Sequence, residues 1–170
     1  LAQFVGQEIS ESLLVELAAE YARIFLGAGA IQSGVAFPYE SVYTSPRGLL
    51  LQAARDAVVE FYRQVGVQSS SHFHCPEDHV ALEMEFIAHL CEKTQHALKK
   101  GNTETAAYYL EMQFNFFERH LCTWTPRFFV DLFQAASTDF YKAVALIAGG
   151  YLSIDRNLVE DLLEMVKTEV

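Results

Sequence analysis

The stretch HFHCPEDHVALEMEFIAHL, residues 72–90, joins a cluster of polar side chains to an apolar segment with helical spacing. Proline suits the first turn of a helix because its missing N–H would have no partner there. Glu77 and Asp78 then place negative charge at the positive end of that helix, and Asp78 is a candidate N-cap. We therefore predict a helix from about Pro76 to Lys100.

Helical periodicity also covers most of the remaining chain, and the sequence pattern contains no alternating strand of useful length. The segment 27–46 is rich in glycine and proline and is expected to be a loop. The predicted helices cover residues 10–27, 46–66, 76–100, 103–121, 127–148 and a last stretch after Asp155.

Capping and breaking residues set the expected ends of these helices. Ser10 or Ser12 can cap the first helix, and Gly27 can end it. Pro126 is expected to break the helical pattern that follows residue 103, because proline lacks the N–H of a helix interior. Gly149-Gly150 is expected to end the fifth helix.

The polar sequence VQSSSHFHC, residues 67–75, is the best candidate for a linker. We expect an all-α, compact bundle of six or more helices in two halves, residues 1–66 and 79–170, joined by a hinge at 67–78 into one integrated domain. The linker would also allow two chains to exchange halves, so we expect a monomer or a domain-swapped homodimer.

The charge balance narrows the classes of partner. The chain has 22 acidic and 12 basic residues, a formal net charge of −10. This balance argues against nucleic acid, which requires clustered lysine and arginine, and favours a positively charged partner. No apolar run is long enough to insert stably in a membrane, and no signal peptide is visible, so we expect a cytoplasmic protein. The three widely spaced cysteines do not suggest a disulfide scaffold.

The polar cluster before the helix allows two chemical alternatives. His72, His74, Cys75 and His79 are competent zinc ligands, but a structural zinc site normally draws on a second, separate ligand pair. Cys75 beside histidines could be a nucleophile, but no oxyanion motif or ordering acid accompanies it. The residues around Cys75 therefore do not favour nucleophilic catalysis. Of the residues in this stretch, Asp78 and His79 are explained least completely by the requirements of a helix start.

The segment CPEDHVALEMEFIAHL resembles the hinge motif of the TorD/DmsD/NarJ-type chaperones, which assist maturation of molybdenum-cofactor redox enzymes. The family usually has an acid directly before the proline, where this chain has Cys75. Further segments resemble the family in chain order: LAAEYARIFLGAG, FPYESVYTS, EFYRQVG, FFERHLCTWTPRFF and FYKAVALIAGGYLSID.

The resemblance implies a TorD-like fold and a non-enzymatic chaperone. Such a protein binds the twin-arginine signal peptide, or the apo form, of a molybdenum-cofactor oxidoreductase and assists cofactor insertion before export. No cofactor of its own is expected. Guanine nucleotide binding is suggested by the resemblance alone, because the chain has no GxxxxGK[ST] loop.

A twin-arginine peptide carries two guanidinium groups beside an apolar segment. Guanidinium groups are bound best by carboxylates, and the apolar segment needs a groove. The candidate peptide-binding residues are Pro76, Glu77, Asp78, His79, Glu83, Tyr21, Tyr43, His120 and Trp124. Structural roles remain open for several of them, among them core packing for Tyr21 and a buried plug for Trp124. A general regulator of protein assembly remains an alternative, as does a metal-binding helical protein.

Overall fold

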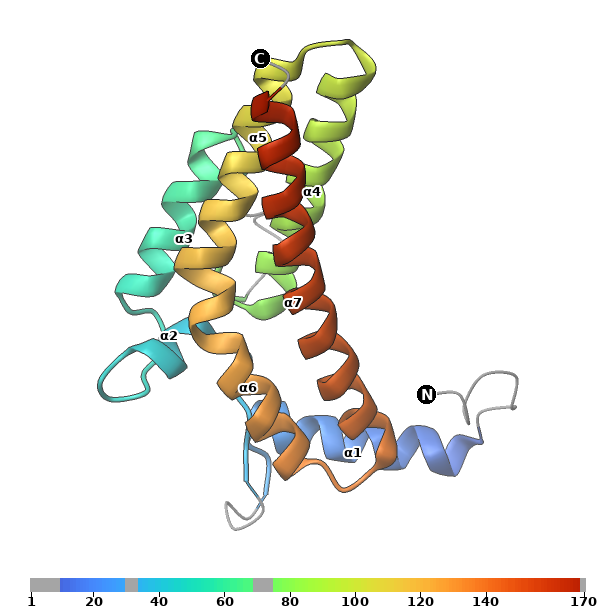
Figure 1. The fold of residues 1–170 in the computed structure, drawn as a ribbon. Coiled ribbons are helices and arrows are strands. Elements are labelled where there is room, and N and C mark those ends of the chain that lie inside the picture. Colours follow the sequence, from blue (N-terminus) through green and yellow to red (C-terminus); the bar gives the residue numbers. More distant parts are fainter. Residues whose placement is uncertain (1–9, 30–33, 69–74, 169–170) are drawn as a thin grey trace. The chain divides into compact units, whose positions relative to one another are not determined.

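The computed structural model describes residues 10–29, 34–68 and 75–168. Within these ranges the chain is helical, and its β-structure is one isolated antiparallel bridge between Tyr39 and His79, so the all-α prediction is confirmed. The elements are α1 Glu11–Leu26, α2 Glu40–Thr44, α3 Ala53–Gln64, α4 Val80–Lys99, α5 Thr103–Phe116, the π-helical turn η2 Phe117–Leu121, α6 Cys122–Ala135 and α7 Asp139–Thr168 (Figure 1).

These elements form two compact units. The first contains Leu1–Pro38 and Pro126–Tyr151, and the second contains Tyr39–Thr125 and Leu152–Val170. The hinge at residues 67–78 stays a prediction, because residues 69–74 lie outside the described residues. No helix in the described part of the chain is both long and apolar enough to cross a membrane.

In the first unit, α1 has the ends that its sequence predicts. The Ser10 side chain accepts a hydrogen bond from the Leu13 N–H, and Gly27 takes the left-handed conformation with φ of 68°. Glu20, buried on α1, accepts hydrogen bonds from the backbone N–H groups of Ser137 and Thr138. This carboxylate therefore ties α1 to the connection that precedes α7.

The predicted break at Gly149-Gly150 is wrong, as is a helix start at Asp155, because α7 runs through both positions. A Cβ atom on Gly149 would lie 3.4 Å from the Phe129 ring. That distance is an ordinary contact, so the packing of Gly149 against Phe129 does not by itself require glycine at this position.

Pro126 also lies inside a helix rather than ending one. The π-helical turn η2 precedes it, and threonine side chains bind the backbone there. Thr123 Oγ1 donates to the His120 carbonyl at 2.6 Å, and Thr125 Oγ1 donates to the Leu121 carbonyl at 2.7 Å. Side-chain donors therefore satisfy carbonyls in the turn before the proline.

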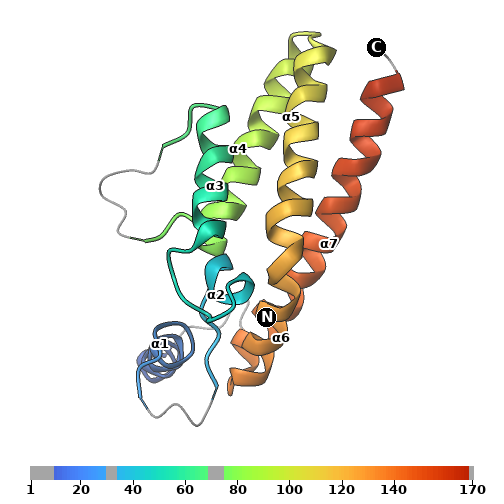
Figure 2. The same cartoon turned by 90° about the vertical axis from the view of Figure 1, so that its left-hand side faces the viewer.

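In the second unit, α3, α4, α5 and the last part of α7 lie side by side (Figures 1 and 2). Aromatic rings fill the space between the first three helices, with the Phe86 ring centroid 4.8 Å from that of Phe116 and 4.7 Å from that of Tyr62. Burial of each such ring contributes about 1.5–3 kcal/mol. This core includes α4, which carries Glu83 and directly follows the predicted site residues Pro76, Glu77, Asp78 and His79.

Three helix starts in this unit differ from the sequence expectation. The predicted loop 27–46 contains the short helix α2. The next helix begins at Ala53 rather than Pro46, because Gly48 and Leu51 have positive φ values of 61° and 56°, which no helix accommodates. Helix α4 begins at Val80 rather than Pro76.

Candidate functional site

Asp78 caps a helix that is distant in the sequence. Its Oδ2 accepts the Ser41 N–H at 2.8 Å, and its carbonyl accepts the Glu40 N–H at 3.0 Å. Both donors belong to the first turn of α2, whose own N-cap residue, Tyr39, provides no side-chain bond. Asp78 is 0% exposed, so its carboxylate holds α2 in place rather than lying on the surface.

His79 is the N-cap of α4, where Asp78 was the expected cap. Its Nδ1 accepts the Ala81 N–H at 3.1 Å, and its ring meets that of Tyr39 edge-on, with the centroids 5.0 Å apart. Burial lowers the pKa of His79, against a smaller opposing effect of the Asp78 charge. A lowered pKa keeps Nδ1 free of a proton, as this cap requires.

Glu77 binds the Arg55 side chain of α3 at two points. Glu77 Oε2 lies 2.6 Å from Arg55 Nε, and Glu77 Oε1 lies 2.9 Å from Arg55 Nη2. The hydrogen bonds from Arg55 lower the pKa of Glu77. The Tyr62 hydroxyl also donates to the Glu77 carbonyl at 3.0 Å. These contacts fasten the segment before α4 to α3.

A buried polar cluster lies behind α2. His120 Nδ1 and Glu40 Oε2 are 2.8 Å apart, and Trp124 Nε1 donates to Glu83 Oε2 at 3.1 Å. All four side chains are buried. Burial, and then the nearby negative charge of Glu40, raises the pKa of Glu83 well above its ordinary value. The prediction that Trp124 is buried with its N–H bonded is confirmed.

The structure gathers eight of the nine predicted site residues in the second unit, whereas Tyr21 belongs to the first. The side chain of Tyr21 is 47% exposed, with its ring 5.0 Å from that of Phe25, so it is not a core residue. Tyr43, half-buried, lies with its ring centroid 5.6 Å from that of Trp124. The side chains of Asp78 and Glu83 are fully buried.

Sequence reasoning missed two partners of this cluster. Glu40 is the acidic residue of the segment FPYESVYTS, and its place inside a family-like segment was the available signal. Nothing in the sequence indicated the role of Arg55, because its partner Glu77 lies 22 residues away. Among the described residues, His120 Nδ1 has Glu40 as its hydrogen-bond partner.

Two adjoining pockets lie along α3. The first has a volume of 390 Å³, and the second has a volume of 530 Å³. Ala57 and Arg119 line both pockets, so we treat them as one feature, the α3 groove. Its α3 side consists of Ala53, Ala54, Ala57, Glu60, Phe61 and Gln64, and the α5–η2 side consists of Tyr108, Glu111, Met112, Asn115, Arg119 and His120.

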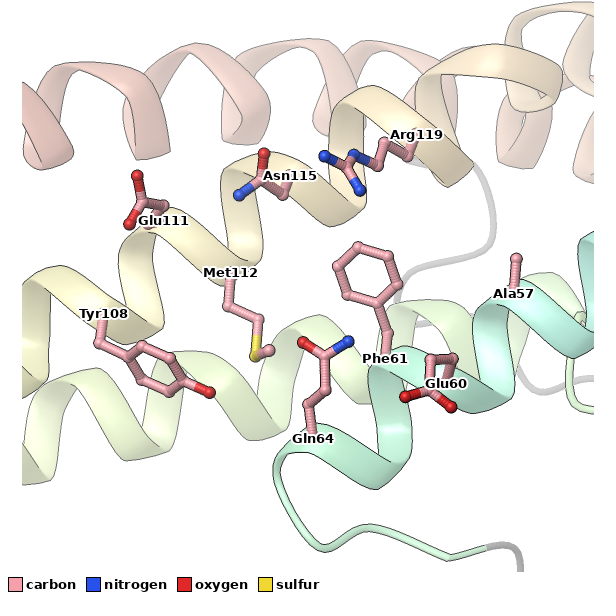
Figure 3. Close-up of a pocket in the computed structure, with 9 residues that line it drawn as sticks. All are labelled: Ala57, Glu60, Phe61, Gln64, Tyr108, Glu111, Met112, Asn115 and Arg119. Atoms are coloured by element: carbon pink, nitrogen blue, oxygen red, sulfur yellow. The ribbon is translucent and has the colours of Figure 1, made fainter.

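Figure 3 shows Phe61 and Gln64 reaching from α3 toward Met112 of α5. The second pocket adds the side chains between α2 and α3 and the buried Glu40–His120 pair. Arg119 belongs to the π-helical turn η2, and such turns occur often at functional sites. It is exposed and has no ion pair or hydrogen bond with another described residue.

Metal binding finds no support in the described ranges, which hold no group of three or more histidine, cysteine, aspartate or glutamate side chains that could bind an ion. His72 and His74, two members of the predicted metal cluster, lie outside the described residues. Cys75 has a free thiol, as do Cys91 and Cys122.

Comparison with known proteins identifies the family. The model of the family described as "Nitrate reductase delta subunit" matches residues 1–130. The chain belongs to this family, which confirms the resemblance to TorD/DmsD/NarJ-type proteins.

Relatives with the name "Chaperone protein TorD" cover most of the chain. That of Vibrio cholerae serotype O1, strain O395, is 30% identical over 150 residues, 88% of this chain and 65% of the relative. That of Aliivibrio fischeri, strain ES114, is 28% identical over 145 residues, 85% of this chain and 65% of the relative. That of Shewanella oneidensis, strain MR-1, is 30% identical over 155 residues, 88% of this chain and 64% of the relative.

This chain therefore spans slightly less than two thirds of the length of these relatives. No solved structure matches it significantly.

Proposed function

We propose that this protein is a maturation chaperone for a molybdenum-cofactor oxidoreductase. It binds the twin-arginine signal peptide or the apo form of that enzyme and assists cofactor insertion before export. The observation that carries this proposal is the family match over residues 1–130, together with relatives named as TorD chaperones. The chaperone acts in the cytoplasm, without enzymatic activity and without a cofactor of its own.

The electrostatics of the chain support a basic, apolar client segment. The net charge of −10 attracts a peptide with two guanidinium groups and accelerates the encounter at low salt. The α3 groove offers apolar and polar side chains together, as peptide-binding grooves do. An acidic surface and a mixed groove fit such a segment better than they fit nucleic acid.

The nine predicted site residues divide into two roles in this proposal. The buried residues Asp78, Glu83, His120 and Trp124 hold α2 and α4 in the form that the client recognises. The accessible residues Pro76, Glu77, His79 and Tyr43 border the client-binding site of the second unit without pairing with the client's arginines. Tyr21, on the first unit, is a separate contact for the client.

Binding to a molybdenum-cofactor oxidoreductase in its apo form tests the proposal. The apoenzyme with its twin-arginine leader and the same apoenzyme without the leader are titrated against the purified chain by calorimetry. We expect binding to the full apoenzyme, weakened or lost without the leader. Lack of binding to either form at low salt, tested with the enzymes encoded next to this chain, would overturn it.

A further inference from the structure

We propose that the α3 groove is the docking site for the arginine-bearing peptide, an inference that rests on the proposed function above. The acids predicted to bind the peptide leave little room for a guanidinium group. Asp78 and Glu83 are 0% exposed, and both oxygens of Glu77 are already bound by Arg55. A peptide arginine therefore needs acids elsewhere in the same unit.

Small side chains keep the groove open. Ala53, Ala54 and Ala57 follow one another at helical spacing on the α3 face that lines the pockets. Longer side chains at these positions would fill the space. The opposite wall continues past His120 to Thr123 of α6, which also lines the second pocket. From Tyr108 to Thr123 it measures about 22 Å at about 1.5 Å per helical residue, enough for about seven residues of extended peptide.

The chemistry of the groove matches a basic group next to an apolar segment. Phe61 and Met112 form apolar surface between the walls (Figure 3), while Glu60 and Glu111 stand on opposite sides. Both acids are more than half exposed. Among the described residues, each pairs with an exposed cation, Glu60 with Arg63 and Glu111 with Lys167. Such exposed pairs are weak, so a peptide arginine can replace either cation.

The charge of Arg119 determines in which direction the peptide lies in the groove. As a cation at the junction of the two pockets, it repels the arginines of the ligand. The arginines therefore lie toward Glu60 and Glu111, and the apolar segment passes Arg119 toward the alanines. The guanidinium N–H groups of Arg119, which bind no other described residue, then donate to main-chain carbonyls of the peptide.

A binding experiment with two variants and matched controls tests this inference on the full chain. The probe is a synthetic peptide with two adjacent arginines followed by an apolar segment, titrated by calorimetry. Ala57→Trp fills the junction of the pockets, and Ala88→Trp, at an exposed alanine of α4 that lines neither pocket, is its control. Glu60→Gln/Glu111→Gln removes the acids, and Glu92→Gln, exposed on α4, is its control.

We expect Ala57→Trp to weaken binding about tenfold or more and the double glutamine variant to weaken it several-fold with a smaller salt dependence. Both controls should bind as the unmodified protein does. If the unmodified protein binds the peptide and neither groove variant changes the affinity, the groove is not the docking site. If the unmodified protein does not bind the peptide, this inference fails, whereas the proposed function fails only if the apoenzyme does not bind either.

Discussion

Arg55 Nε lies 2.6 Å from Glu77 Oε2, and Arg55 Nη2 lies 2.9 Å from Glu77 Oε1. The carboxylate of Glu77, which follows Pro76, is therefore already paired with an arginine of the same chain. The geometry is the two-point pairing that a peptide arginine would make. It links α3 to the segment before α4, and it leaves client recognition to other acids of the second unit.

Glu77→Gln should lower the free energy of unfolding by about 1 kcal/mol at neutral pH, because a partly buried two-point pair is lost. Arg55 lowers the pKa of Glu77 in the folded state, so this stabilisation is present above the pKa of the unfolded state and disappears as the pH falls through the folded pKa. Urea unfolding as a function of pH measures it. Glu85→Gln, at an exposed position of α4, is the control, and an equal loss in both variants would contradict the prediction.

His120→Ala should lower the free energy of unfolding by about 1–3 kcal/mol, because it leaves Glu40 Oε2 buried without its hydrogen-bond partner. Glu40→Gln/His120→Ala should cost less than the sum of the two single changes, since the pair is removed together. Denaturant unfolding of the three variants provides the double-mutant cycle. If the losses in the free energy of unfolding are additive, the 2.8 Å contact between His120 and Glu40 does not couple the two residues energetically, which would contradict the prediction.

Glu83→Gln should gain stability relative to the unmodified protein as the pH rises. Burial and the charge of Glu40 raise the pKa of Glu83 in the folded state, so the folded state holds a proton that the unfolded state releases above its ordinary pKa of 4.5. The stability of the unmodified protein thus falls with pH in this range, by up to about 1.4 kcal/mol per pH unit, and glutamine removes the effect. Thermal unfolding from pH 4.5 to pH 7 checks it, and a constant difference between the two proteins would contradict it.

His79→Asn should preserve the start of α4, because asparagine is a strong N-cap. Burial lowers the pKa of His79 in the folded state, so the histidine contributes stability above its ordinary pKa of 6.5 that is lost as the pH falls below that value. The variant should lose less stability than the unmodified protein between pH 6.5 and pH 5. Amide exchange in α4 measures the same difference locally, and equal pH profiles would refute the assignment.

Local signals predicted the helices that local interactions stabilise. Ser10 and Gly27 mark the ends of α1 because both caps act within one turn. Helix α2 escaped prediction because it has five residues and its first N–H groups are bound by Asp78, 37 residues away. The low helix propensity of glycine predicts a helix end at Gly149-Gly150, but the helical residues on both sides override it in α7.

The candidate site was predicted only in part, because local sequence signals do not indicate contacts between residues that are distant in the sequence. The motif around Asp78 and His79 identified the segment, but their roles as caps of α2 and α4 depend on contacts that cross the fold. The α3 groove was not foreseen. Its alanines indicate only helix propensity until Met112 and Arg119 are found opposite them.

The most direct measurement of the central claim compares two peptides that differ in one respect. A synthetic peptide with two adjacent arginines before an apolar segment, and the same peptide with two lysines, are titrated calorimetrically into the full chain at low salt. Planar guanidinium groups pair with carboxylates at two points and ammonium groups do not, so a chaperone selective for twin-arginine leaders should bind the lysine peptide about tenfold more weakly. Equal affinities would indicate a general regulator of protein assembly and contradict the account.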